Sequence, residues 1–175
     1  MSVERQSKSQ AFVEYVLDRG SNDSGFMARL RRADNPATEY QSWDILAGFG
    51  VRLDSDEERL PYALVGAAIA HAQDRKNGSM GLGRAVAAAF DGGNQSDQAN
   101  VRIRRVLGCK RLKELCRVLR PLLRLIHSRT GGCVNYASLL SDLLYFNASP
   151  SRIKTKWAQQ FYGNNASSSQ NGSES

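Results

Sequence analysis

The sequence predicts an all-α protein of two small helical bundles, about eight or nine helices in total, followed by a disordered C-terminal tail. Three observations predict this class: apolar residues recur at helical spacing almost throughout, no convincing alternating strand pattern appears, and capping residues and glycines separate the periodic segments. The glycine-rich segment 91–95 (DGGNQ) is the clearest internal boundary, so the bundles are expected at residues 8–92 and 95–163. Residues 164–175 are polar and have nothing to bury.

The N-terminal half is expected to form five helices. Ser21, Asn22 or Asp23 can cap the second, because short polar side chains accept hydrogen bonds from the first free backbone N–H groups. The five helices are expected over residues 9–19, around Phe26, Met27 and Leu30, around Trp43 to Phe49, over residues 57–73 and over residues 82–90.

Five large aromatic residues from both halves of the chain are expected in the core, because such side chains anchor small helical cores. They are Trp43, Tyr145, Phe146, Trp157 and Phe161.

The C-terminal half is expected to form four more helices. Asn135 and Ser149 stand at N-cap positions, and Pro150 suits the first helical position because its missing N–H would have no partner there. Pro121 lies inside an expected helix and should kink or divide it. The expected helices are residues 97–107, 111–128, 135–146 and 150–162.

Nearly all of the net charge of +7 lies in one short segment. Residues 102–129 contain ten Lys and Arg residues and a single acid, Glu114, whereas residues 1–101 are net negative. A charge concentrated in this way indicates a polyanionic partner more strongly than a diffuse excess does. An ordinary solvated helix face is the alternative, but such faces normally mix charges of both signs.

The basic residues of this segment follow helical spacing. In the expected helix 111–128, apolar residues form one core-facing stripe, and basic residues at steps of four and three form another face. Such a stripe can follow a phosphate backbone. Residues 102–129 contain no Phe, Tyr or Trp, so the surface is suited to holding backbone rather than to stacking bases. The basic residues are Arg102, Arg104 and Arg105 in the preceding helix, Lys110 and Arg111 at the turn, and Lys113, Arg117, Arg120 and Arg124 in the stripe.

The sequence gives little support to an enzyme, a metal site or a cofactor. The segment GSMGLGRA at 78–85 is a near miss to a P-loop: Arg84 replaces the lysine, Ala85 replaces the hydroxyl residue, and a helix rather than a strand precedes it. His71 and His127 lack ligand-type neighbours at metal-binding spacing, and no Ser-His-Asp or Cys-His arrangement stands out. We therefore expect a non-catalytic protein with no cofactor and no metal.

The cysteines and the N-terminus indicate a cytoplasmic protein. Three cysteines at uneven spacing fit neither a disulfide framework nor a CxxC zinc site, and Cys116 falls on an apolar helical face. The N-terminus lacks the apolar run of a secretory signal, and no apolar stretch is long enough to span a bilayer.

Three motifs in order resemble the CasB family, the small subunit of the type I-E CRISPR surveillance complex Cascade. They are MARLRRADNP at 27–36, GLGRAVA at 81–87 and VRIRRVLGCKRLKELCRVLRPLLRLI at 101–126, which two closing helices follow. Each motif is weak alone, and their order and spacing carry the resemblance over roughly residues 8–163.

The resemblance implies a helical, RNA-binding and DNA-binding subunit of an antiviral CRISPR complex. In the family, two copies pack head to tail, contact the backbone subunits and the large subunit, and help to hold the guide RNA–target DNA hybrid and the displaced strand of the R-loop. The guide supplies sequence specificity, and protein contacts tip a nearly balanced strand exchange.

The resemblance also implies which basic residues contact phosphate. The family's basic positions match Arg102, Arg111 and Arg120, and less securely Arg59. Arg31, Arg32 and Arg84 fall inside the other matching motifs, although Arg31 or Arg84 can instead pair with a carboxylate of the chain and only brace the fold. Pro121 departs from the family pattern and leaves the direction of Arg120 open.

Two other functions compete with this interpretation. A helix-turn-helix regulator would place the second helix of residues 97–124 in a major groove, but it needs base-reading Asn or Gln, and residues 101–129 contain neither. A helical adaptor for an acidic protein partner would show no salt-dependent binding to DNA or RNA.

Overall fold

The computed structural model describes the backbone of residues 2–163 and the side chains of residues 8–163. Within these residues the chain forms nine α-helices, three short 3-10 helices and no strand, which confirms the predicted all-α class. The predicted tail at 164–175 lies outside the described residues. The elements are α1 (Ser2–Gly20), α2 (Ser24–Arg31), η1 (Arg32–Asp34), η2 (Glu39–Ser42), α3 (Trp43–Phe49), α4 (Asp56–Ala72), α5 (Leu82–Ala88), η3 (Gly93–Gln95), α6 (Asp97–Gly108), α7 (Leu112–Thr130), α8 (Tyr136–Tyr145) and α9 (Pro150–Tyr162).

Local hydrogen bonds define where several helices begin. The side chain of Asp23 accepts a hydrogen bond from the backbone N–H of Phe26 at 2.9 Å, so Asp23 is the cap among the three predicted candidates. Asn135 caps α8 in the same way, as predicted. Ser149 precedes α9 without a side-chain cap, and Pro150 occupies the first turn. Two of the nine helices end in glycines with positive φ, a conformation that glycine adopts without steric cost.

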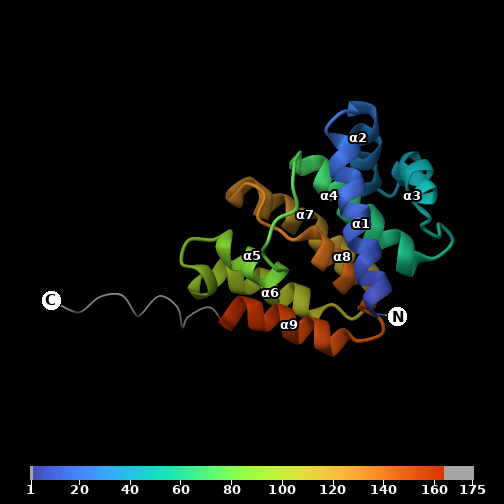
Figure 1. The fold of residues 1–175 in the computed structure, drawn as a ribbon. Coiled ribbons are helices and arrows are strands. Elements are labelled where there is room, and N and C mark those ends of the chain that lie inside the picture. The colour runs from blue at the N-terminus through green and yellow to red at the C-terminus, as the bar shows by residue number, and fades with distance from the viewer. Residues whose placement is uncertain (1, 164–175) are drawn as a thin grey trace.

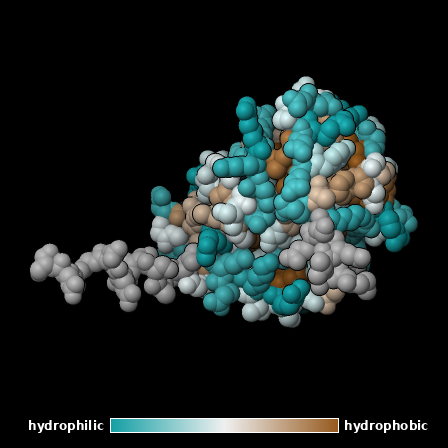
Figure 2. All heavy atoms as spheres, in the orientation of Figure 1, coloured by the Kyte–Doolittle hydropathy of each residue, from teal (hydrophilic) through white to brown (hydrophobic). Residues whose placement is uncertain are grey.

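The helices pack as two groups that share a middle layer (Figure 1). α1, α2 and α4 lie together in the upper right of the view, and α5, α6 and α9 lie together at the lower left. α7 packs against α4, α5 and α6, and α8 packs against α1, α4 and α9, so these two helices join the groups. One continuous cluster of buried apolar residues runs through the molecule. Hydrophilic residues cover most of the face in Figure 2, with hydrophobic residues in separate patches.

The division into bundles at residues 8–92 and 95–163 stays a prediction. The helix contacts run across that boundary, because α8 returns to pack against α1 and α4, and α5 packs against α9. The charged helix α7 is therefore held between elements from both halves of the chain.

The glycine-rich segment that resembles a P-loop serves helix packing. A Cβ atom built on Gly83 would clash with the backbone carbonyl of Trp157 on α9, and one on Gly81 would clash with the side chain of Gln160. Gly83 therefore lets α5 and α9 approach closely, whereas the flexible end of Gln160 could move away from a side chain at Gly81. Upstream, the N–H of Met80 donates to the carbonyl of Cys133 at 2.9 Å and ties this segment to the strand-like bridge before α8.

The predicted aromatic core is confirmed in part. Phe146, Trp157 and Phe161 are fully buried, and Tyr145 is half-buried at the edge of the core. Trp43 is 38 % exposed, so its placement in the core was wrong. Trp43 begins α3, a helix of seven residues that buries only Ile45 and Leu46, which leaves its first turn at the surface.

Candidate nucleic-acid interface

Helices α6 and α7 direct their basic residues outward because their apolar residues are buried. Ser96 caps α6 by accepting a hydrogen bond from the N–H of Ala99, and Ile103 and Val106 anchor the helix in the core. The predicted apolar stripe of α7 is confirmed, since all seven of its residues are buried: Leu112, Leu115, Cys116, Leu119, Leu122, Leu123 and Ile126. The basic residues from Arg102 to Arg117 occupy exposed positions between them, while Leu107, Val118 and Leu125 lie partly buried against the core.

Seven basic side chains of α6, the following turn and the start of α7 are exposed and, among the described residues, form no ion pair. The single acid of the segment, Glu114, accepts a hydrogen bond from the backbone N–H of Lys110 at 3.2 Å and forms no ion pair within the described part of the chain. The positive charges are therefore uncompensated within the described chain, which favours a polyanionic ligand. The seven residues are Arg102, Arg104, Arg105, Lys110, Arg111, Lys113 and Arg117.

A groove of about 530 Å³ lies between the start of α7 and residues 36–60, and we call it the basic groove. Its floor includes apolar atoms of Pro36, Leu60 and Cys116. Burial raises the pKa of the Cys116 thiol to about 12, so at neutral pH this residue is an uncharged thiol. Five predicted phosphate contacts from two distant parts of the sequence line the groove: Arg59, Arg111, Lys113, Arg117 and Arg120.

Arg59 is committed to contacts within the chain. Its guanidinium group contacts Glu39 at 2.9 Å and Asp56 at 2.6 Å, and it donates to the carbonyl of Leu53 at 2.5 Å. Only 19 % of its side chain is exposed. Arg59 therefore braces the wall of the basic groove, and two carboxylates balance its charge.

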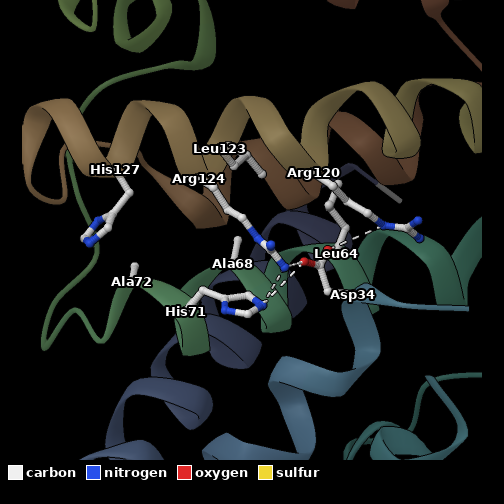
Figure 3. Close-up of a pocket in the computed structure, with 9 residues that line it drawn as sticks. All are labelled: Asp34, Leu64, Ala68, His71, Ala72, Arg120, Leu123, Arg124 and His127. Carbon is white, nitrogen blue, oxygen red and sulfur yellow. Dashed lines mark hydrogen bonds and ion pairs between the residues drawn. The ribbon is translucent and has the colours of Figure 1, made fainter. Parts of the chain in front are cut away.

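Arg120 and Arg124 lie farther along α7, at a second cavity of about 260 Å³ between α4 and α7 (Figure 3). Arg120 Nε is 3.6 Å from one carboxylate oxygen of Asp34, and Arg124 forms an ion pair with the other oxygen. Arg124 also lies 2.9 Å from His71 Nε2, which in turn is 3.4 Å from Asp34. The last two arginines of the stripe thus converge on one carboxylate.

His71 is held in its neutral form at this cluster. Burial lowers the pKa of His71 below its ordinary value of 6.5, the positive charge of Arg124 lowers it further, and Asp34 opposes both effects. A neutral imidazole with an unprotonated Nε2 can accept a hydrogen bond from Arg124. The cluster therefore carries two guanidinium charges against one carboxylate.

The other predicted phosphate contacts lie outside the basic groove and, like those that line it, stay predictions. Arg31 donates from Nε to the carbonyl of Ala70 at 3.0 Å, so it pairs with backbone rather than with a carboxylate. Arg32 hydrogen-bonds to the side chain of Gln41. Arg84 is exposed on α5, and Arg102 is exposed on α6.

Pro121 does not divide α7. One uninterrupted helix runs from Leu112 to Thr130 through this residue. Pro121 cannot donate to the carbonyl of Arg117, but both residues are exposed, so water can satisfy that carbonyl.

Sequence reasoning missed Asp34 and Glu39, the carboxylates that hold Arg120, Arg124 and Arg59. Asp34 stands inside the motif MARLRRADNP, but its partner Arg124 is 90 residues away. No local spacing signals a contact over that distance.

The family comparison decides where this chain belongs. The family model described as CRISPR-associated protein Cse2 matches residues 26–162. The chain belongs to the Cse2 family. The predicted resemblance to CasB, the name that several solved Cse2-type structures carry, is thereby confirmed.

Solved structures of the Cse2 type share this fold. CasB from M. ruber is 27 % identical with a TM-score of 0.70, and the match covers 89 % of this chain and 93 % of that one. A Cse2-family protein from Thermus thermophilus is 23 % identical with a TM-score of 0.73, over 89 % of this chain and 97 % of that one. A chain of a CRISPR RNA-guided surveillance complex is 24 % identical with a TM-score of 0.70, over 91 % and 93 %. No match was found among curated proteins.

The described residues of this Cse2-family chain contain neither of two other kinds of site. Within them, no group of three or more His, Cys, Asp or Glu side chains is placed to hold a metal ion. None of the described helices is long and apolar enough to cross a membrane.

Proposed function

We propose that this Cse2-family chain is the small subunit of a type I-E CRISPR surveillance complex and that it holds nucleic-acid backbone without catalysing a reaction. The observation that carries the proposal is that seven basic side chains of α6, the following turn and the start of α7 are exposed and form no ion pair within the described residues, and that three of them line the basic groove. The likeness to a chain of an RNA-guided surveillance complex supports it.

The chemistry of this face favours contact with phosphates over contact with bases. Guanidinium and ammonium groups neutralise phosphate charge, and no aromatic side chain lies in residues 102–129 to stack on a base. Binding is then independent of sequence and sensitive to salt. Such contacts suit a subunit that stabilises a guide–target hybrid and a displaced strand, because base pairing with the guide supplies the specificity.

The proposal includes the partners that this role needs. They are guide RNA, target DNA including the displaced strand, the backbone and large subunits of the complex, and a second copy of this chain.

Fluorescence anisotropy of the isolated chain tests the nucleic-acid part of the proposal. Single-stranded DNA, RNA and duplex DNA of unrelated sequences are titrated across a salt series. We expect weak, sequence-independent binding to single strands. A variant with Arg102, Arg111 and Arg117 changed to Ala should lose about two units from the slope of log K against log salt, since each phosphate contact contributes about 0.7 for a single strand.

A matched variant controls for loss of net charge. Arg75, Lys76 and Arg152 are exposed and lie outside the basic groove, so changing all three to Ala removes the same charge elsewhere. This control should keep most of the wild-type slope. Equal losses in the two variants, or tight preference for one duplex sequence, would contradict backbone holding by this face.

A further inference from the structure

The cavity between α4 and α7 has the composition of an anion site that one carboxylate already fills. Arg120, Arg124, His71 and His127 line it together with small apolar residues of α4 (Figure 3). Asp34, which η1 contributes, is the single carboxylate among its lining residues. Carboxylate and phosphate oxygens both accept hydrogen bonds from guanidinium groups in similar geometry.

Asp34 neutralises the two arginines only in part. Two guanidinium charges face one carboxylate, and the neighbouring His71 is held neutral, so the cluster keeps an excess of positive charge. Nε of Arg120 is buried and forms no hydrogen bond within the described residues. The side chain of Arg124 is 55 % exposed, so a ligand from solvent can reach it.

The local structure around Asp34 holds its carboxylate in place. Its side chain is only 10 % exposed, and the neighbouring Ala33 is buried in the core. The hydroxyl of Thr38 donates to the carbonyl of Arg32 at 2.8 Å, and the side chain of Asn35 accepts from the N–H of Ala37 at 2.9 Å. These bonds order the turn that presents Asp34, so little conformational entropy opposes its pairing with α7.

We propose that Asp34 is an internal competitor for phosphate: it pairs with Arg124 and lies 3.6 Å from Nε of Arg120, at the place where a nucleic-acid phosphate would otherwise bind. This inference rests on the proposed function. It divides the basic residues of α7 into two classes. Arg111 just before the helix, Lys113 and Arg117 are available to a ligand, whereas Arg120 and Arg124 lie against Asp34, which limits how tightly the subunit holds backbone by itself.

The variant Asp34→Asn tests the competition, because it keeps the size of the side chain and removes its charge. We expect the affinity for single-stranded DNA at low salt to rise about fivefold, and the slope of log K against log salt to steepen by about 0.7, as one more phosphate contact requires. Adding Arg124→Ala to this variant should abolish the gain. Binding by a folded Asp34→Asn protein that is no tighter than that of the wild type would overturn the proposal.

A second comparison does not depend on the folding of Asp34→Asn. Arg117 and Arg124 are both exposed arginines on α7, but only Arg124 is paired with Asp34. Arg117→Ala should weaken binding, whereas Arg124→Ala alone should leave it within about twofold of the wild type. Equal losses in the two variants would show that Asp34 does not withhold Arg124 from the ligand. If the proposed function itself is wrong, the result is different: Arg117→Ala then leaves the affinity for single-stranded DNA unchanged.

Discussion

Residues of one type have different roles on this surface because their neighbours differ. Arg117 is exposed without an ion pair among the described residues, Arg59 is balanced by two carboxylates, and Arg124 shares Asp34 with a second arginine. The carboxylates of Glu39 and Asp34 are only 11 % and 10 % exposed, so they stay beside their arginines and decide which arginine can meet a phosphate.

His71 should make stability depend on pH. Because its pKa is lowered in the folded protein, the unfolded chain binds a proton more readily. Above pH 6.5, His71 is neutral in both the folded and the unfolded chain and does not affect the free energy of unfolding. As the pH falls below 6.5, the unfolded chain takes up the proton first, so the free energy of unfolding decreases until the folded-state pKa is passed. We expect the fall in melting temperature between pH 7.5 and 5.5 to be smaller in His71→Gln than in the wild type.

Asp74 is the main confounding group in that experiment. Burial raises the pKa of its carboxyl, so the folded protein loses stability at Asp74 as the pH rises from 3.8. Both proteins keep Asp74, and its effect cancels in the difference between them. Identical pH profiles for the wild type and His71→Gln would contradict the assignment to His71.

Gly83 should tolerate no side chain. A Cβ atom there would meet the backbone of Trp157, which cannot move without shifting α9. We expect Gly83→Ala to lower the free energy of unfolding in urea by about 1–3 kcal/mol. Gly48→Ala is the control, because nothing lies within 4 Å of its added Cβ, and it should be neutral or stabilising by up to about 1 kcal/mol. Equal effects would rule out close packing as the role of Gly83.

At the scale of helices, local sequence predicted most of what the structure contains. Helix caps and apolar stripes depend on residues that are only a few positions apart in the chain. Asp23, Asn135 and the buried stripe of α7 could therefore be predicted from the sequence. Trp43 was misplaced because hydrophobicity does not reveal that a short helix buries only part of its surface.

Pro121 gives the sharpest test at this scale. Proline inside a helix costs up to about 3 kcal/mol, through the lost hydrogen bond and the clash of its ring with the preceding turn. We expect Pro121→Ala to raise the free energy of unfolding by about 1–3 kcal/mol, measured by urea denaturation, and to leave nucleic-acid binding unchanged. A change in binding would show that Pro121 also influences which basic residues of α7 meet the ligand.

At the scale of the whole molecule, the contacts that build the site join distant segments. Arg59 meets Glu39 across 20 residues, and Asp34 meets Arg124 across 90. Helical periodicity carries no information about such pairs, which follow from where η1 and η2 lie relative to α4 and α7. The basic face could therefore be predicted from sequence, whereas the division of its arginines into available and engaged residues could not.

Asn77 should stabilise the connection between the two halves of the chain. Its side chain accepts from the N–H of Tyr136 at 2.7 Å and donates to the side chain of Asn135 at 2.8 Å. Losing both hydrogen bonds should cost about 1–3 kcal/mol in Asn77→Ala, measured by urea denaturation. Asn22→Ala is the control. It removes an exposed side-chain amide that has no hydrogen-bond partner among the described residues, so it should change the free energy of unfolding by less than about 0.5 kcal/mol.

The central claim is that the basic face of α6 and α7 holds nucleic-acid backbone within an RNA-guided complex. Its most direct test uses a complex reconstituted with guide RNA and its other subunits. The fluorescence of a labelled base in the displaced strand then measures how much of the target DNA is opened. With Arg102, Arg111 and Arg117 changed to Ala, we predict that the complex assembles and that the opened fraction falls at physiological salt. The Arg75, Lys76 and Arg152 control should open the target like the wild type. Full opening by the complex with the altered basic face would contradict the claim.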